Sequence, residues 1–212
     1  MRLDAGMLWT ALVPVKSSAF AKSRLDHDPM TRAGLSAAFL ADVLAALAQT
    51  SSIGEILVVT DDAELHLRVD SSVRIHRTIA RGLNPELAEG LVLIGKSPVA
   101  IVAADLPCLT KEALTATLRI AQEFDRSFVT DVQGLGTTML LAKDAQECVP
   151  MFGRRSHARH AQAGYHEIQA DSPAIAAHMA RVRRDVDTAL DLWDAIRIGV
   201  GPSTTEALAE NK

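Results

Sequence analysis

The chain has 212 residues, of which 48% are hydrophobic and 4% aromatic, and its formal net charge at pH 7 is -4. This composition suits one α/β domain with a large core, and it excludes a disordered chain. The negative charge and scarce aromatic rings argue against a nucleic-acid partner. No apolar run reaches about 18 residues and no secretory pattern opens the chain, so we expect no membrane segment. Cys108 and Cys148 lack metal-ligand spacing and fit a reducing cytoplasm.

Strands and helices are predicted to alternate over about the first 125 residues. We expect strands at Leu8–Val15, Glu55–Thr60, Val73–Thr78 and Pro98–Ala103. We expect helices from Pro29 to about Ala48, from the capping pair Asp61-Asp62 through Val69, from Pro85 to Ile94 and from Thr110 to Glu123. This alternation predicts right-handed crossovers and a three-layer α/β/α domain around a mixed, mainly parallel sheet.

The pattern changes after this point. Ser127–Asp131 and Thr137–Lys143 predict two short strands, whose connection forms a hairpin or a crossover lying over the sheet. A strand at Tyr165–Ile168 and helices at Pro173–Val182 and Thr188–Ile198 follow, and the last ten residues are expected to fray. No repeat or linker is evident, so we expect a single domain over residues 1–212, with its core at about 8–201.

The tetrad Ala104-Asp105-Leu106-Pro107 directly follows the apolar run Pro98–Ala103, which predicts a fully buried strand. Open α/β sheets bind ligands at the carboxyl ends of their strands, and Pro107 ends this strand there. A carboxylate in that place suits a magnesium ion on the phosphates of a nucleotide. The alternative is an aspartate that only caps the next helix.

The loop after the first strand contains three cations, Lys16, Lys22 and Arg24, together with three serines. Such a loop can offer backbone donors and positive charge to a triphosphate, although it lacks the glycines of a Walker A loop. Its alternative is a solvated basic loop.

Two glycine-containing segments are further candidates. Gly82 allows close approach of a ligand to the backbone, and Asn84 can recognise a base edge with its donor and acceptor; otherwise Asn84 caps a helix. Gly134 to Thr138 joins a glycine-rich loop to two hydroxyl groups that can donate to a phosphate; otherwise it is a plain turn before a strand.

Segment 152–160 contains three arginines, Ser156, His157 and His160, which predicts anion binding rather than a solvated helix start. The two histidines lie three residues apart, but no third soft ligand suggests zinc. Later in the chain, Asp185 and Asp187 lie two residues apart in an extended stretch. Either could join Asp105 around one magnesium ion, unless Asp187 or Thr188 only caps the next helix.

Seven of these segments occur in an order that resembles the phospholactate guanylyltransferases, which make the phosphodiester linker of coenzyme F(420). They are Val-Pro-Val-Lys with Ala-Lys-Ser-Arg-Leu, Val-Val-Thr-Asp-Asp, Gly-Leu-Asn, Ala-Asp-Leu-Pro, Gly-x-Gly-Thr-Thr, Phe-Gly-x-x-Ser-x-x-x-His and Asp-Val-Asp-Thr. The resemblance runs from about Ala11 to Gly201 and implies a Rossmann-like nucleotidyltransferase fold. The related molybdenum-cofactor nucleotidyltransferases usually have a glycine-rich first loop, which this chain lacks.

The resemblance also implies roles for particular residues. Asp105 and Asp187 would bind Mg²⁺; Lys16, Lys22 and Arg24 would contact the nucleotide phosphates and act with Asp105 in catalysis; Gly82 and Asn84 would bind guanosine; Thr138, Gly153 and Ser156 would bind a phosphorylated three-carbon acid. The implied reaction joins GMP from GTP to 2-phospho-L-lactate, phosphoenolpyruvate or 3-phosphoglycerate and releases pyrophosphate. The other classes considered are a molybdenum-cofactor or sugar-phosphate nucleotidyltransferase and a non-catalytic nucleotide-binding partner.

We therefore expect GTP and a small phospho-acid as partners, with no nucleic acid and no membrane. Handover of the labile product to the next enzyme of the pathway is a further expectation. The sequence leaves the oligomeric state open.

Overall fold

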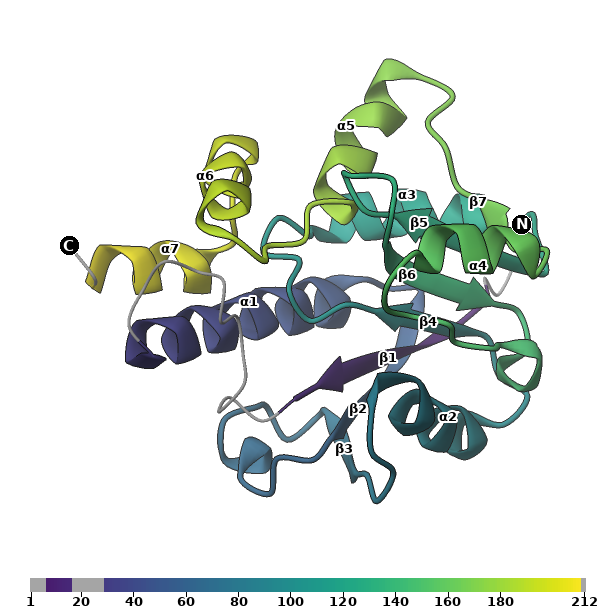
Figure 1. Ribbon diagram of the computed structural model, residues 1–212, viewed down its shortest axis with the longest axis horizontal. Helices are drawn as coiled ribbons and strands as arrows, with labels where there is room; N and C mark the ends of the chain where they lie inside the picture. Colours follow the sequence, from purple (N-terminus) through teal and green to yellow (C-terminus); the bar gives the residue numbers. More distant parts are fainter. Residues whose placement is uncertain (1–6, 17–28, 211–212) are drawn as a thin grey trace, which may run out of the picture.

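A computed structural model of the chain describes residues 7–16 and 29–210 (Figure 1). Its centre is a seven-stranded sheet in the order β3-β2-β1-β4-β6-β5-β7. The strands are β1 (Trp9–Val15), β2 (Ile53–Thr60), β3 (Arg74–Arg77), β4 (Val99–Val102), β5 (Arg126–Thr130), β6 (Thr137–Ala142) and β7 (His166–Glu167). Of these described strands six run in one direction and β6 runs against its neighbours β4 and β5. The predicted mixed, mainly parallel sheet is confirmed.

Helices cover both faces of the sheet, as Figure 1 shows. They are α1 (Pro29–Gln49), α2 (Leu83–Ile94), α3 (Lys111–Ala121), α4 (Ser156–Gln162), α5 (Pro173–Val182), α6 (Ala189–Ile198) and α7 (Pro202–Glu210). Side chains alternate along β1: Ala11 and Val13 pack with α1, α3 and α5, whereas Leu12 packs with α2. This period of two is what a strand buried on both faces requires.

The pair β5–β6 is an antiparallel hairpin within the sheet, so of the two predicted alternatives the hairpin is confirmed and the crossover was wrong. β6 inserts between β4 and β5, and Leu140 and Leu141 are fully buried on its two faces. Long-range pairing of this kind depends on register against β4, which local sequence does not specify.

Two expectations were also wrong, one about the helix after β2 and one about the C-terminal residues. The segment after β2 forms only the short 3₁₀ helix η2 (Leu65–Leu67), and Asp62 accepts a hydrogen bond from the Glu64 amide before it at 2.9 Å. The C-terminal segment does not fray over its length, because it forms α7 beside α1. The buried carboxylate of Asp42 in α1 accepts hydrogen bonds from the amides of Ser203 and Thr204 in the first turn of α7.

Helix α1 corrects the expectation that no apolar stretch of the chain is long enough to span a membrane. Its residues Thr31–Gln49 are long and apolar enough to span a membrane by length and composition alone. Half of this stretch is buried inside the domain, where it packs on β2, α3 and α7. An amphipathic helix with one face in a core accounts for this apolar composition.

Candidate active site

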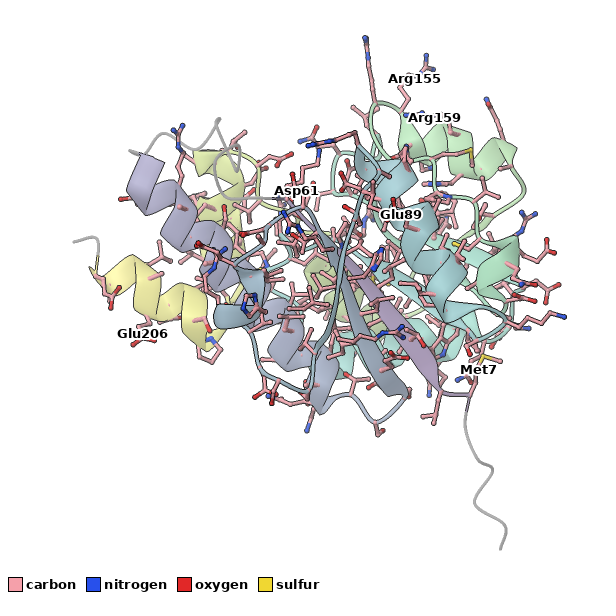
Figure 2. The ribbon with its side chains drawn as sticks, turned by 90° about the horizontal axis from the view of Figure 1, so that it is seen from below. Met7, Asp61, Glu89, Arg155, Arg159 and Glu206 are labelled. Atoms are coloured by element: carbon pink, nitrogen blue, oxygen red, sulfur yellow. The ribbon has the colours of Figure 1, made fainter. Side chains whose placement is uncertain are left out.

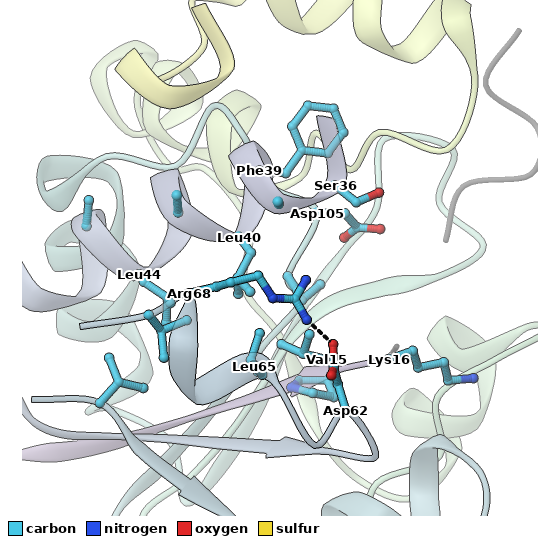
Figure 3. Close-up of a pocket in the computed structure, with 18 of the residues that line it drawn as sticks. Val15, Lys16, Ser36, Phe39, Leu40, Leu44, Asp62, Leu65, Arg68 and Asp105 are labelled. Atoms are coloured by element: carbon cyan, nitrogen blue, oxygen red, sulfur yellow. Dashed lines mark hydrogen bonds and ion pairs between the residues drawn. The ribbon is translucent and has the colours of Figure 1, made fainter. Parts of the chain in front are cut away.

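A cleft with a volume of about 800 Å³ opens at the carboxyl ends of β1 and β4. Because these parallel strands end at the same edge of the sheet, the residues that follow them meet there. Figure 3 shows Asp105 and Ser36 beside α1, with Lys16 and the ion pair of Asp62 and Arg68 across the cavity. Asp187 also lines this cleft.

Asp105, Asp185 and Asp187 lie near the carboxyl end of β4, and Asp105 and Asp187 among them line the cleft. The amide of Val186 donates a hydrogen bond to the carbonyl of Asp105 at 3.1 Å, and the Val186 side chain is fully buried. This contact places Asp185 and Asp187 beside the end of β4. Burial, followed by the carboxylates of Asp105, Asp187 and Asp131, raises the pKa of Asp185 to about 7. Asp105 and Asp187 both line the cleft, and their joint binding of one metal ion stays a prediction.

The donor set suits magnesium. Carboxylates are hard oxygen ligands, and the carboxylates of Asp105, Asp187 and Asp131 add to burial in raising the pKa of Asp185. Within residues 7–16 and 29–210, no group of three or more His, Cys, Asp or Glu side chains is placed to hold a metal ion. Mg²⁺ is usually held by one or two carboxylates plus substrate phosphates, so Asp105 and Asp187 fit as its protein ligands.

Helix α6 begins just after this acidic cluster. Thr188 caps it by accepting a hydrogen bond from the Asp191 amide, and the Asp191 carboxylate accepts the Thr188 amide in return. This reciprocal capping box fixes the entry of the chain into α6. The capping role considered for Asp187 or Thr188 thus belongs to Thr188, and Asp187 lines the cleft instead.

Among the described residues, Lys16 and Arg68 bring positive charge to the cleft. Lys16 directly follows β1, and its exposed side chain lines the cavity. Lys22 and Arg24 lie outside the described residues. Arg68 is a second cleft cation, paired with Asp62. Arg68 was not predicted from the sequence, because the segment that contains it was expected to form a short helix through Val69.

Ser36 is another cleft residue that sequence reasoning missed. Its hydroxyl group is buried and makes no hydrogen bond in the described part of the chain. Its position on α1, far from every glycine-rich or acidic motif, gave no signal of a site.

Gly82 and Asn84 lie at the start of α2. Gly82 is the residue before the helix, with φ of 102°, and its amide donates to Glu86 Oε1 at 3.0 Å. Asn84 lies inside the helix, so the alternative helix-capping role is wrong for it. Its amide group donates to the carbonyl of Phe152 at 3.1 Å and accepts from the amide of Phe152 at 2.8 Å. Asn84 thereby fastens the segment before Gly153 to α2, and guanosine binding by this pair stays a prediction.

Thr138, Gly153 and Ser156 come from two neighbouring segments. Thr138 is buried at the start of β6, and Ser156 is buried at the start of α4. Gly153 has φ of 105°, which only glycine adopts readily, and its carbonyl accepts the Ser156 amide at 3.0 Å. The amide of His157 donates to the carbonyl of Leu135 at 3.2 Å, which joins the two segments.

Asp131 organises the connection between β5 and β6. Its carboxylate accepts hydrogen bonds from the amides of Leu135 at 2.9 Å and Gly136 at 2.7 Å. Its carbonyl accepts from the guanidinium of Arg183 at 2.9 Å, which ties this loop to the segment that contains Asp185. The signal for this role was an aspartate shortly before a Gly-x-Gly loop.

The arginines of segment 152–160 lie apart from the cleft. Arg154 and Arg155 are exposed, and Arg159 donates to the carbonyl of Arg154. Figure 2 shows Arg155 and Arg159 close together beside α4. None of the three lines the cavity, so their predicted binding of an anion has no support from the cleft as the structure describes it.

The fold and this cleft define the class of protein: a nucleotidyltransferase of the three-layer α/β type. A crystal structure of a Desulfovibrio desulfuricans protein described as a nucleotide-diphospho-sugar transferase superposes with a TM-score of 0.71 at 19% identity, covering 97% of this chain and 96% of that one.

The family model described as "Guanylyl transferase CofC like" matches residues 9–210, and the chain belongs to this family of guanylyltransferases. A protein of Streptomyces coelicolor named phosphoenolpyruvate guanylyltransferase is 39% identical over 211 residues, which cover 96% of this chain and 97% of that protein. A protein of Geodermatophilus obscurus with the same name is 37% identical over 94% of both chains.

Proposed function

We propose that this guanylyltransferase transfers GMP from GTP to phosphoenolpyruvate or a closely similar phosphorylated three-carbon acid, in the biosynthesis of coenzyme F(420). An oxygen of the acid's phosphate attacks the α-phosphorus of GTP. The bond from the α-phosphorus to the bridging oxygen breaks, and pyrophosphate leaves with that electron pair. The names of the similar proteins from Streptomyces coelicolor and Geodermatophilus obscurus support phosphoenolpyruvate as the acid.

The observation that supports this proposal most strongly is that Asp105, Asp187 and Lys16 line one cleft at the carboxyl edge of the sheet. Two phosphate-bearing anions repel each other, so the enzyme must align them and offset their charge. A bound Mg²⁺ would neutralise the triphosphate and polarise the α-phosphate. Asp105 and Asp187 would hold that ion, and Lys16 would add positive charge on the opposite wall.

The chemistry needs no protein nucleophile, because the acid supplies the attacking oxygen. Positioning is then the main task of the chain, and the acid subsite would lie near Thr138 and the segment from Gly153 to Ser156. We also propose a cytoplasmic location and, because the diester product is labile, handover to the following enzyme.

The test is a matrix of substrates with purified protein and Mg²⁺. Each of the four ribonucleoside triphosphates is paired with 2-phospho-L-lactate, phosphoenolpyruvate, 3-phosphoglycerate and a sugar phosphate, and pyrophosphate release and product mass are measured. We expect pyrophosphate with GTP and a three-carbon acid only. Turnover with another nucleotide or with the sugar phosphate, or no turnover at all, would contradict the proposal.

A further inference from the structure

His160 is a fully buried histidine of α4 that uses both of its ring nitrogens. Nδ1 lies 2.9 Å from Thr137 Oγ1, and Nε2 accepts a hydrogen bond from the amide of Met151 at 3.1 Å. A backbone amide can only donate, so Nε2 must be unprotonated. The proton of the neutral ring is therefore on Nδ1, which donates to Thr137 Oγ1.

These two partners belong to the two segments expected to bind the phospho-acid. Thr137 directly precedes Thr138 at the start of β6. Met151 lies two residues before Gly153 in the segment that leads into α4. The imidazole ring therefore bridges the strand that contains Thr138 and the segment that contains Gly153 and Ser156.

The surroundings of His160 make the bridge rigid. The rings of Phe152, Tyr165 and Phe128 surround it at centroid distances of 5.4, 5.5 and 5.9 Å. This aromatic wall leaves the ring no exposure to solvent, so water has no access to replace either hydrogen bond. Loss of the bridge should therefore change the spacing of the two segments rather than be compensated.

We propose that His160 is a positioning residue that sets the distance between Thr138 and the Gly153–Ser156 loop and so determines the affinity for the phospho-acid, with little effect on the nucleotide. This inference rests on the proposed function. His160 does not contact the substrate; it acts through the two segments it joins. A histidine with a merely structural role would affect stability and the two substrates without distinction.

The test compares steady-state kinetics of four variants with the unaltered protein, at pH 7.5 and well below each melting temperature. His160→Phe keeps the ring volume but removes both nitrogens, whereas His160→Gln keeps a side chain that can donate and accept. Thr137→Val removes the acceptor of Nδ1 from the opposite side. Leu118→Ala, at a buried core position of α3, is the control for lost stability alone.

We expect His160→Phe to raise the KM for phosphoenolpyruvate about 10- to 100-fold, the scale of a small misplacement of binding groups, while the KM for GTP changes less than about twofold. His160→Gln should restore most of the affinity, Thr137→Val should raise the same KM, and Leu118→Ala should change neither. If His160→Phe does not fold, Thr137→Val and His160→Gln decide the matter through the same two KM values.

Equal changes in both KM values, unchanged KM values, or a Gln variant no better than the Phe variant would overturn the role of His160 while leaving the proposed function intact. Absence of pyrophosphate from the unaltered protein with every acid would overturn both.

Discussion

Replacing Asp105 with asparagine removes one of the carboxylates that crowd the carboxyl edge of the sheet and keeps the side-chain shape. Asparagine cannot offset the charge of a divalent cation, so the variant should lose one of the two proposed protein ligands of Mg²⁺. Loss of a main electrostatic stabiliser lowers turnover about 100-fold, which corresponds to about 2.7 kcal/mol of transition-state stabilisation.

The structure predicts the opposite sign for stability. Asp105 is among the charges that raise the pKa of Asp185, so these carboxylates repel each other in the folded protein. Removing one of them should leave the melting temperature unchanged or higher. A fall in activity can then not be explained by unfolding.

The assay is pyrophosphate release at saturating GTP and phosphoenolpyruvate, measured over a series of Mg²⁺ concentrations. Asp125→Asn is the matched control, because the Asp125 side chain is 96% exposed and its ion pair with Lys143 lies at the protein surface. A near-normal rate of Asp105→Asn at limiting Mg²⁺ would refute the metal assignment.

Three further predictions concern stability. Asp42→Ala removes the buried acceptor of two amides in the first turn of α7, and we expect a loss of about 1–3 kcal/mol in urea unfolding; an unchanged midpoint would contradict this anchor. Burial, followed by the positive charges of Arg159 and His157, lowers the pKa of His160 to about 4. The ring of Tyr165 packs against the imidazole and is part of this burial. The contribution of neutral His160 to the free energy of unfolding is fully present above the pKa of about 6.5 that histidine has in the unfolded chain. As the pH falls from there towards 4, about 3 kcal/mol of this free energy is lost, because only the unfolded chain takes up the proton. Urea unfolding of the unaltered protein and of His160→Phe over this range should show a steeper fall with the histidine, and parallel curves would count against it. Gly90→Ala would bring a Cβ within 2.7 Å of Leu12 in β1, and a cost of about 1–3 kcal/mol in thermal unfolding is expected; a neutral result would mean that α2 shifts freely.

The position of the cleft follows from local sequence signals. An apolar run followed by Asp105 predicts a carboxylate at the edge of a parallel sheet, and the same rule places Lys16 after β1. Asp187 follows no such strand, and its proximity to Asp105 was suggested only by its chemistry and by the family resemblance. The structure supplies the reason through the hydrogen bond from Val186 to the Asp105 carbonyl.

Other parts of the site depend on partners that are distant in the sequence. Asn84 binds the backbone of Phe152, and His160 binds Thr137, so neither role can be inferred from the residues around them. The same holds for α7, whose first turn is fastened by Asp42 on α1. Local patterns predict most of the strands and helices, but long-range hydrogen bonds decide which of them come together.

The most direct test of the account is a crystal structure with GTP and Mn²⁺, whose anomalous scattering marks the metal. We predict one Mn²⁺ bound by oxygens of Asp105 and Asp187 and by the triphosphate, within the cleft beside α1. A metal bound by the phosphates alone, or a nucleotide bound away from both aspartates, would contradict it.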